Sequence, residues 1–141
     1  MQKIALEINQ NSKKTQIMES KKPTFGHGKI CYIEVPAADI AASAAFFETV
    51  FNWHIRRDNH GGVSFDDGVG QVSGMWVTGR NPTDGCGLIV SIMVDDAAAT
   101  VAKIEANAGI IVQPIGKDFP EITAAFKDPA GNLWSIYQHR G

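Results

Sequence analysis

FDDGVG at residues 65–70 and FKDPAG at residues 126–131 share one pattern, F-x-D-x-x-G, at an offset of 61 residues. Asp and Gly in this spacing favour a tight turn, and the Phe belongs to a strand that enters it. Upstream of each turn, Asp39 and Asp96 can each cap a helix. The repeated turn and the repeated cap together predict two copies of one structural unit.

The predicted elements follow the same order in both copies. Residues 29–35 are rich in β-branched and aromatic residues, as in a strand, and a helix with one apolar face follows. That face contains Ile40, Ala44, Phe47 and Phe51. An offset of 57 residues places these positions on Ala97, Val101, Ile104 and Ala108. All four replacements are apolar, so the second copy can form the same helix.

We therefore predict an α+β fold in which two tandem βαβββ modules form a curved mixed sheet around a cleft, with the helices on the outside. Module one spans residues 28–78, a turn-rich linker spans 79–87, and module two spans 88–139, all within a domain of residues 28–141. Residues 1–27 are predicted to be a flexible arm, an added strand, or an arm around a dimer partner. The rival interpretation is a ferredoxin-like dimeric barrel whose two βα segments are alike by chance.

The composition argues against several classes of partner. Thirteen Lys and Arg against fifteen Asp and Glu leave a formal charge of −2, with no basic stripe suited to nucleic acid or a membrane surface. No apolar run approaches the roughly 20 residues that span a bilayer. Cys31 and Cys86 match no metal-binding or redox spacing, and no secretory signal opens the chain. We expect a cytoplasmic protein in which Cys31 is an inert buried thiol.

Three stretches of the sequence resemble the vicinal oxygen chelate superfamily, which includes glyoxalase I, bleomycin-resistance proteins and extradiol dioxygenases. They are IEVPAAD at residues 33–39, FFETVFNW at residues 46–53 and FKDPAGNLW at residues 126–134. The resemblance covers about residues 29–139. It implies the paired-module fold more directly than it implies any activity.

The resemblance also implies a divalent metal such as Zn, Ni, Mn or Fe, held in the cleft by His, Glu or Gln. The matching positions here are Tyr32, Gly74, Ile89 and Ser135. Glycine and isoleucine offer no side-chain donor, serine is a poor neutral ligand, and a tyrosine with a pKa of about 10 must lose its proton to bind well. We therefore expect neither a metal nor another cofactor. The alternative is a substitute metal site made by Glu34, His54 and His60.

Strand alternation places Glu34 on the same face as Tyr32, pointing into the expected cleft. Glu34 is thus the candidate catalytic residue, as a general base, unless an arginine pairs with it or it lies exposed at a strand end. The candidate ligand-binding residues are Tyr32, Glu34, Trp53, Trp76, Ser91, Ser135 and Tyr137. The alternative for Trp76 is burial in the core together with Trp134.

Three functions are consistent with these residues. The first is a metal-free homodimeric small-molecule binding protein of the glyoxalase/bleomycin-resistance type, which takes an apolar or planar ligand in its cleft. The second is a lyase, isomerase or hydrolase that uses Glu34, with or without a divalent metal. The third is a domain that binds a protein partner and retains only a vestigial cleft. The sequence leaves open whether the modules pair within one chain or swap between chains.

Overall fold

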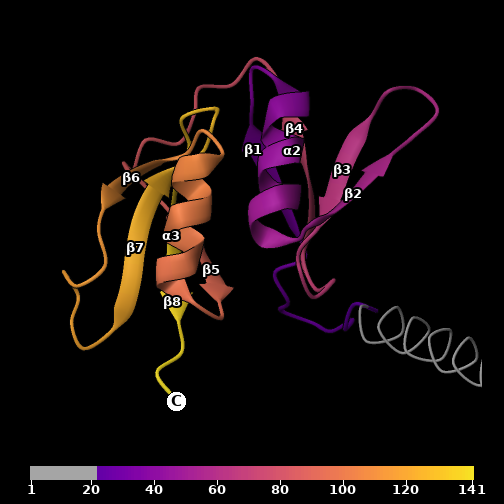
Figure 1. Cartoon of the computed structure of the whole chain (residues 1–141). Coiled ribbons are helices and arrows are strands. Elements are labelled where there is room, and N and C mark those ends of the chain that lie inside the picture. The colour runs from indigo at the N-terminus through magenta and orange to yellow at the C-terminus, as the bar shows by residue number, and fades with distance from the viewer. Residues whose placement is uncertain (1–21) are drawn as a thin grey trace, which may run out of the picture.

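The computed structural model describes residues 22–141, which fold into two modules of the same element order (Figure 1). The first comprises β1 (Tyr32–Pro36), α2 (Ile40–Phe51), β2 (His54–Arg57), β3 (Val63–Asp66) and β4 (Ser73–Val77). The second comprises β5 (Ser91–Val94), α3 (Ala97–Ala106), β6 (Ile110–Gln113), β7 (Ile122–Lys127) and β8 (Leu133–Gln138). The predicted βαβββ order is confirmed. Residues 1–21 of the predicted arm lie outside the described residues.

Both helices begin at the predicted aspartates. The Ala42 backbone N–H donates to Asp39 Oδ1 at 3.0 Å, and the Ala99 N–H donates to Asp96 Oδ1 at 3.0 Å. A side-chain acceptor at this position satisfies a backbone donor that has no partner within the helix. α2 ends at Asn52, whose left-handed φ of 58° turns the chain into β2. Neither helix of the described part of the chain is long and apolar enough to cross a membrane.

The F-x-D-x-x-G pattern forms an aspartate-closed hairpin turn in each module. Asp67 Oδ1 accepts from the N–H of Gln71 at 2.7 Å and of Val72 at 3.1 Å. Asp128 Oδ1 likewise accepts from the N–H of Ala130 at 3.0 Å and of Asn132 at 2.9 Å. The glycine that ends each pattern has a positive φ, a conformation that side chains disfavour. The motif repeats because the same turn needs the same two residue types.

Each module forms its own four-stranded mixed sheet, in the orders β1-β4-β3-β2 and β5-β8-β7-β6. β1 runs parallel to β4 and β5 parallel to β8, while the other pairs are antiparallel. The α+β class and the two modules are confirmed. The curved sheet is divided in two within the described residues, and β1 and β5 are edge strands whose outer edges carry no ladder partner.

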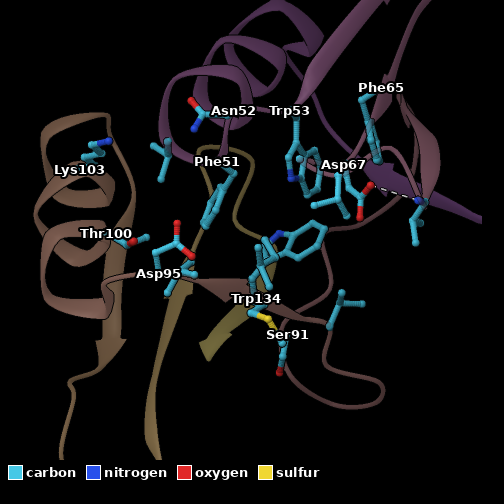
Figure 2. A pocket seen from close by; sticks show the side chains of 18 of the residues that line it. Phe51, Asn52, Trp53, Phe65, Asp67, Ser91, Asp95, Thr100, Lys103 and Trp134 are labelled. Carbon is cyan, nitrogen blue, oxygen red and sulfur yellow. Dashed lines mark hydrogen bonds between the residues drawn. The ribbon is translucent and has the colours of Figure 1, made fainter. Parts of the chain in front are cut away.

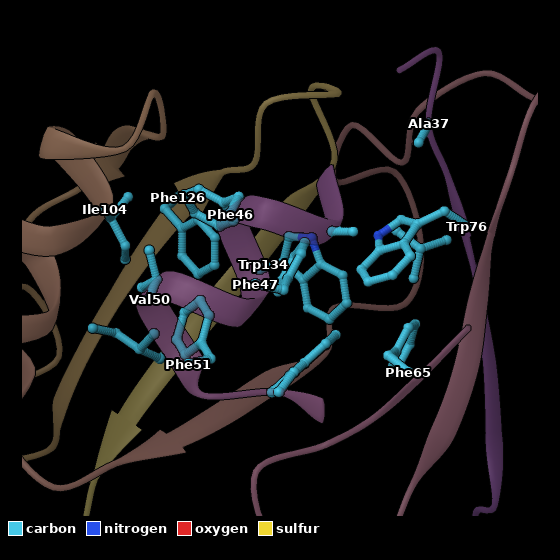
Figure 3. Packing of buried hydrophobic residues seen from close by; sticks show 14 of the residues in the cluster. Ala37, Phe46, Phe47, Val50, Phe51, Phe65, Trp76, Ile104, Phe126 and Trp134 are labelled. Atoms are coloured by element: carbon cyan, nitrogen blue, oxygen red, sulfur yellow. The ribbon is translucent and has the colours of Figure 1, made fainter. Parts of the chain in front are cut away.

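α2 packs in the seam between the modules and not on the outside of a common sheet (Figure 3). The ring of Phe47 lies 4.5 Å from Trp53 and 6.0 Å from Trp76 of module one, and 5.1 Å from Trp134 of module two, measured between ring centroids. Phe46 beside it is also buried. Two adjacent large side chains give α2 an apolar face broad enough to pack against both modules. The core is therefore shared by both modules.

A second link between the modules is the polar network around Asp128, which is 3% exposed. Its Oδ2 accepts from Trp134 Nε1 at 2.9 Å and from Asn132 Nδ2 at 3.0 Å. Asn132 Nδ2 also donates to the Pro36 carbonyl at 2.7 Å, and Asn132 Oδ1 accepts from the Thr83 N–H at 2.9 Å. A buried carboxylate is stable when its lone pairs are satisfied in this way. The network holds the linker and the end of β1 against the β7–β8 turn.

Candidate functional site

One face of each sheet packs on the core and the other is open to solvent; we call the latter the open face of that sheet. On β1, Val35 points to the core and is 2% exposed, whereas Tyr32 on the opposite side is 50% exposed. Glu34 and its register partner Met75 share the open face with Tyr32. Glu34 Oε2 accepts from Arg80 at 2.7 Å. The arginine pairing that the sequence left open as an alternative role for Glu34 is therefore present.

The open face of the second sheet is neutral where its predicted residues lie. Ser91 and Ser135 are register partners, and their hydroxyl oxygens lie 3.0 Å apart. Tyr137 is opposite Met93, whose side chain is 69% exposed. These side chains form a hydroxyl and apolar surface on a different sheet from Tyr32 and Glu34.

The seven residues predicted to line one cleft therefore do not converge within the chain. Tyr32 and Glu34 lie on one open face, while Ser91, Ser135 and Tyr137 lie on the other. Trp53 and Trp76 are on the core side, at 5% and 1% exposed. The prediction of Trp76 as a cleft wall is wrong, because its register with Val35 fixes its side chain toward α2.

The residues present do not suit the metal that the family resemblance implies. Gly74 lies on the core side, where a Cβ would meet the Phe65 ring, so the open-face position belongs to Met75. Its thioether, with Tyr32, Ile89 and Ser135, makes a donor set unsuited to a hard or borderline divalent cation. Among residues 22–141, no three His, Cys, Asp or Glu side chains are close enough to share a metal ion. The substitute site from Glu34, His54 and His60 is thus not assembled.

Both cysteines are exposed, so the expectation of a buried Cys31 thiol is wrong. Cys31 directly precedes β1 at the end of the sheet, where its carbonyl accepts from the Ser73 N–H at 3.0 Å while its side chain stays exposed. Cys86 lies in the linker, and a hydrogen bond with Asp84 raises the pKa of its thiol. Since a raised pKa lowers the thiolate fraction at neutral pH, this interaction makes Cys86 less nucleophilic.

A pocket of about 660 Å³ lies at the seam between the modules (Figure 2). Module one contributes the end of α2 and the β3–β4 turn, and module two contributes β5 and the start of α3. The volume is within the range of about 300–1,000 Å³ typical of small-molecule sites. Two of the predicted ligand-binding residues, Trp53 and Ser91, line it.

The inner wall of the pocket is aromatic. Phe51, Trp53, Phe65 and Trp134 all line it. Trp53 stacks on Phe65 at a centroid distance of 4.5 Å, and Trp134 meets Trp53 nearly edge-on at 6.0 Å. Each of these rings is at most 9% exposed, because neighbouring side chains pack against it, as Phe47 does against Trp53 at 4.5 Å. The wall is therefore apolar and held in place by the core, and it suits an apolar or planar molecule because binding there buries apolar area.

Polar groups gather at the rim of the pocket. Asp95 and Asp96 stand at the start of α3, and Lys103 lies two turns further along it. Asp67 lines the opposite side from the β3–β4 turn. In Figure 2 the Asp95 carboxylate lies between Thr100 and the Phe51 ring. A site with an apolar floor and few polar groups can orient a ligand that has one polar end.

Sequence reasoning missed Phe51, Asn52, Asp95 and Lys103 as pocket residues. The signal that could have found Asp95 is the Asp-Asp pair at residues 95–96, of which only one can cap the helix. The other three carried no sequence signal, because each lies at a seam made by long-range packing.

The chain matches the family model described as the Glyoxalase/Bleomycin resistance protein/Dioxygenase superfamily over residues 29–136. It belongs to this family. No curated protein matches the chain in sequence.

Solved structures share the fold at low identity. The fosfomycin resistance protein FosX from Listeria monocytogenes superposes with a TM-score of 0.67 at 13% identity, over 81% of this chain and 93% of that chain. TnmS3, an antibiotic binding protein from Streptomyces, superposes with a TM-score of 0.62 at 17% identity, over 82% of this chain and 98% of that chain. A hypothetical protein from S. aureus superposes with a TM-score of 0.65 at 17% identity, over 82% of this chain and 96% of that chain. At these identities the likeness concerns the fold alone.

Proposed function

We propose that this family member is a metal-free small-molecule binding protein that takes an apolar or planar ligand in the seam pocket. The observation that carries the proposal is the aromatic inner wall of that pocket, formed by buried rings from both modules. A fold neighbour, TnmS3, is described as an antibiotic binding protein, which is consistent with this class of function. The donor set at the family's metal positions supports a site that works without a cation.

The alternative of a lyase- or isomerase-type enzyme rests on Glu34. A general base needs a free carboxylate within hydrogen-bond reach of the proton it removes. The Arg80 guanidinium already donates to Glu34, and the side chains of both residues are about half exposed. Glu34 is also not one of the residues that line the pocket. The binding function is therefore favoured.

The binding function is tested by calorimetry on untagged protein purified without chelator. We expect 1-naphthalenemethanol, a neutral planar probe, to bind one site per chain with a Kd below about 1 mM, as a fragment of this size can reach. Treatment with EDTA should leave the titration unchanged, and elemental analysis should find no stoichiometric Zn, Ni, Mn or Fe. Stoichiometric metal, or a titration that never saturates, would count against the proposal.

We also propose a homodimer. The edge strands β1 and β5 carry exposed apolar side chains, including Tyr32 at 50% on β1 and Met93 at 69% on β5. Unpaired strand edges with apolar side chains favour pairing with another chain. A second copy that set β1 beside β5 across a two-fold axis would cover both edges.

Sedimentation equilibrium tests the dimer. We expect the wild type to sediment at twice the chain mass of 15.2 kDa. Met93→Asp should shift it toward the monomer, because a charge at the edge opposes strand pairing. Ala45→Asp, which places the same charge on the exposed face of α2, should not. A monomeric wild type at 100 μM would exclude the proposed dimer.

A further inference from the structure

The charges that line the seam pocket are unbalanced. Three carboxylates face one ammonium: Asp67, Asp95 and Asp96 against Lys103. Two of the carboxylates have backbone partners, since Asp67 accepts from two N–H groups of its turn and Asp96 caps α3. Within residues 22–141, Asp95 has neither a hydrogen bond nor an ion pair, so its oxygens are available to a ligand.

Lys103 does not neutralise Asp95. The two side chains form no ion pair within the described residues. Seven helical positions separate the cap residue Asp96 from Lys103, which corresponds to roughly 10 Å along the helix axis. An attraction over that distance at a wet surface is largely screened. The negative charge of Asp95 therefore dominates its own end of the pocket.

The surroundings of Asp95 favour a cation in another way. Asp95 lines the same pocket as the rings of Phe51, Trp53 and Trp134 (Figure 2). Phe47 and Phe65 stack on Trp53, so these rings act as an apolar wall and not as a cation–π site. Beside such a wall the effective dielectric constant is lower than in open water, so the attraction between the Asp95 carboxylate and a cation is stronger there than on a fully wet surface.

We propose that the ligand of this pocket carries a cationic group, such as a protonated amine, that pairs with Asp95 while its planar body lies on the aromatic wall. This inference rests on the proposed binding function and specifies its ligand class. Asp95 sets the preference for charge, and the apolar wall supplies binding that does not depend on charge.

The experiment compares two probes of the same size at pH 7. 1-Naphthylmethylamine is a cation at this pH, and 1-naphthalenemethanol is its neutral counterpart. We expect the wild type to bind the amine about fivefold more tightly, a preference of the size of a partly exposed ion pair. Asp95→Asn should abolish that preference, because it should weaken binding of the amine far more than binding of the alcohol.

Glu105→Gln is the matched control, because it removes one carboxylate from an exposed position of α3 that does not line the pocket. It should keep the fivefold preference, and 0.5 M NaCl should reduce the preference in the wild type. Equal binding of both probes by the wild type, or a preference that survives Asp95→Asn in a variant with an unchanged circular dichroism spectrum, would overturn the inference and leave the binding function standing. Failure of both probes to bind would overturn both.

Discussion

Replacing Phe47 with alanine is expected to lower the free energy of unfolding by about 3–5 kcal/mol, the usual cost of removing a buried phenylalanine ring. Phe47 is fully buried, and its ring packs against Trp53, Trp76 and Trp134. Because these partners come from both modules, the cavity weakens both sides of the seam. Thermal denaturation should show a midpoint lowered by about 10 °C or more.

The prediction also covers the number of unfolding transitions. A shared core predicts one cooperative transition for wild type and variant alike. Glu48→Ala, at the next and exposed position of α2, should change stability by less than about 0.5 kcal/mol. A loss below about 1 kcal/mol for Phe47→Ala, or two separate transitions, would mean that the modules do not share the core described here.

Replacing Ala99 with tryptophan is expected to weaken binding of 1-naphthalenemethanol by about tenfold or more. Ala99 is exposed on the first turn of α3 and lines the seam pocket. An indole at this position occupies space that the ligand needs. Accommodating both the indole and the ligand should cost about 1–3 kcal/mol of binding free energy, as overpacking does in a core. The fold should be kept, since only the backbone N–H of Ala99 takes part in the Asp96 cap.

Ala98→Trp provides the control for that substitution. Ala98 is the preceding residue of the same helix turn, is also exposed, and does not line the pocket. It should bind the probe as the wild type does, with calorimetry as the measurement for both variants. If the two variants bound the probe equally well, the ligand would lie elsewhere on the protein.

The parts of the fold that depend on local chemistry could be predicted from the sequence. Asp39 and Asp96 cap their helices, and the two F-x-D-x-x-G stretches form the turns, because neighbouring backbone groups decide each of these features. The order of strands and helices follows from these signals together with hydrophobic periodicity.

The site could not be predicted to the same extent, because it depends on register and on packing between the modules. The hairpin register pairs Phe65 with Gly74 and Phe126 with Trp134, so the first hairpin is one residue longer than the second. That single residue moves Gly74 to the core side. No local pattern indicates that α2 lies in the seam, and this packing is what separates the two open faces and creates the pocket.

The most direct measurement is a map of backbone amide shifts in a ¹⁵N-labelled sample titrated with 1-naphthalenemethanol. A ligand in the seam should shift the amides of Val72, Val94 and Thr100, which line the pocket from both modules. The amides of Tyr32 and Tyr137, on the open faces, should change least. Shifts confined to Tyr32 and Tyr137 would contradict the account, because the ligand would then bind an open face and the aromatic seam would serve the core alone.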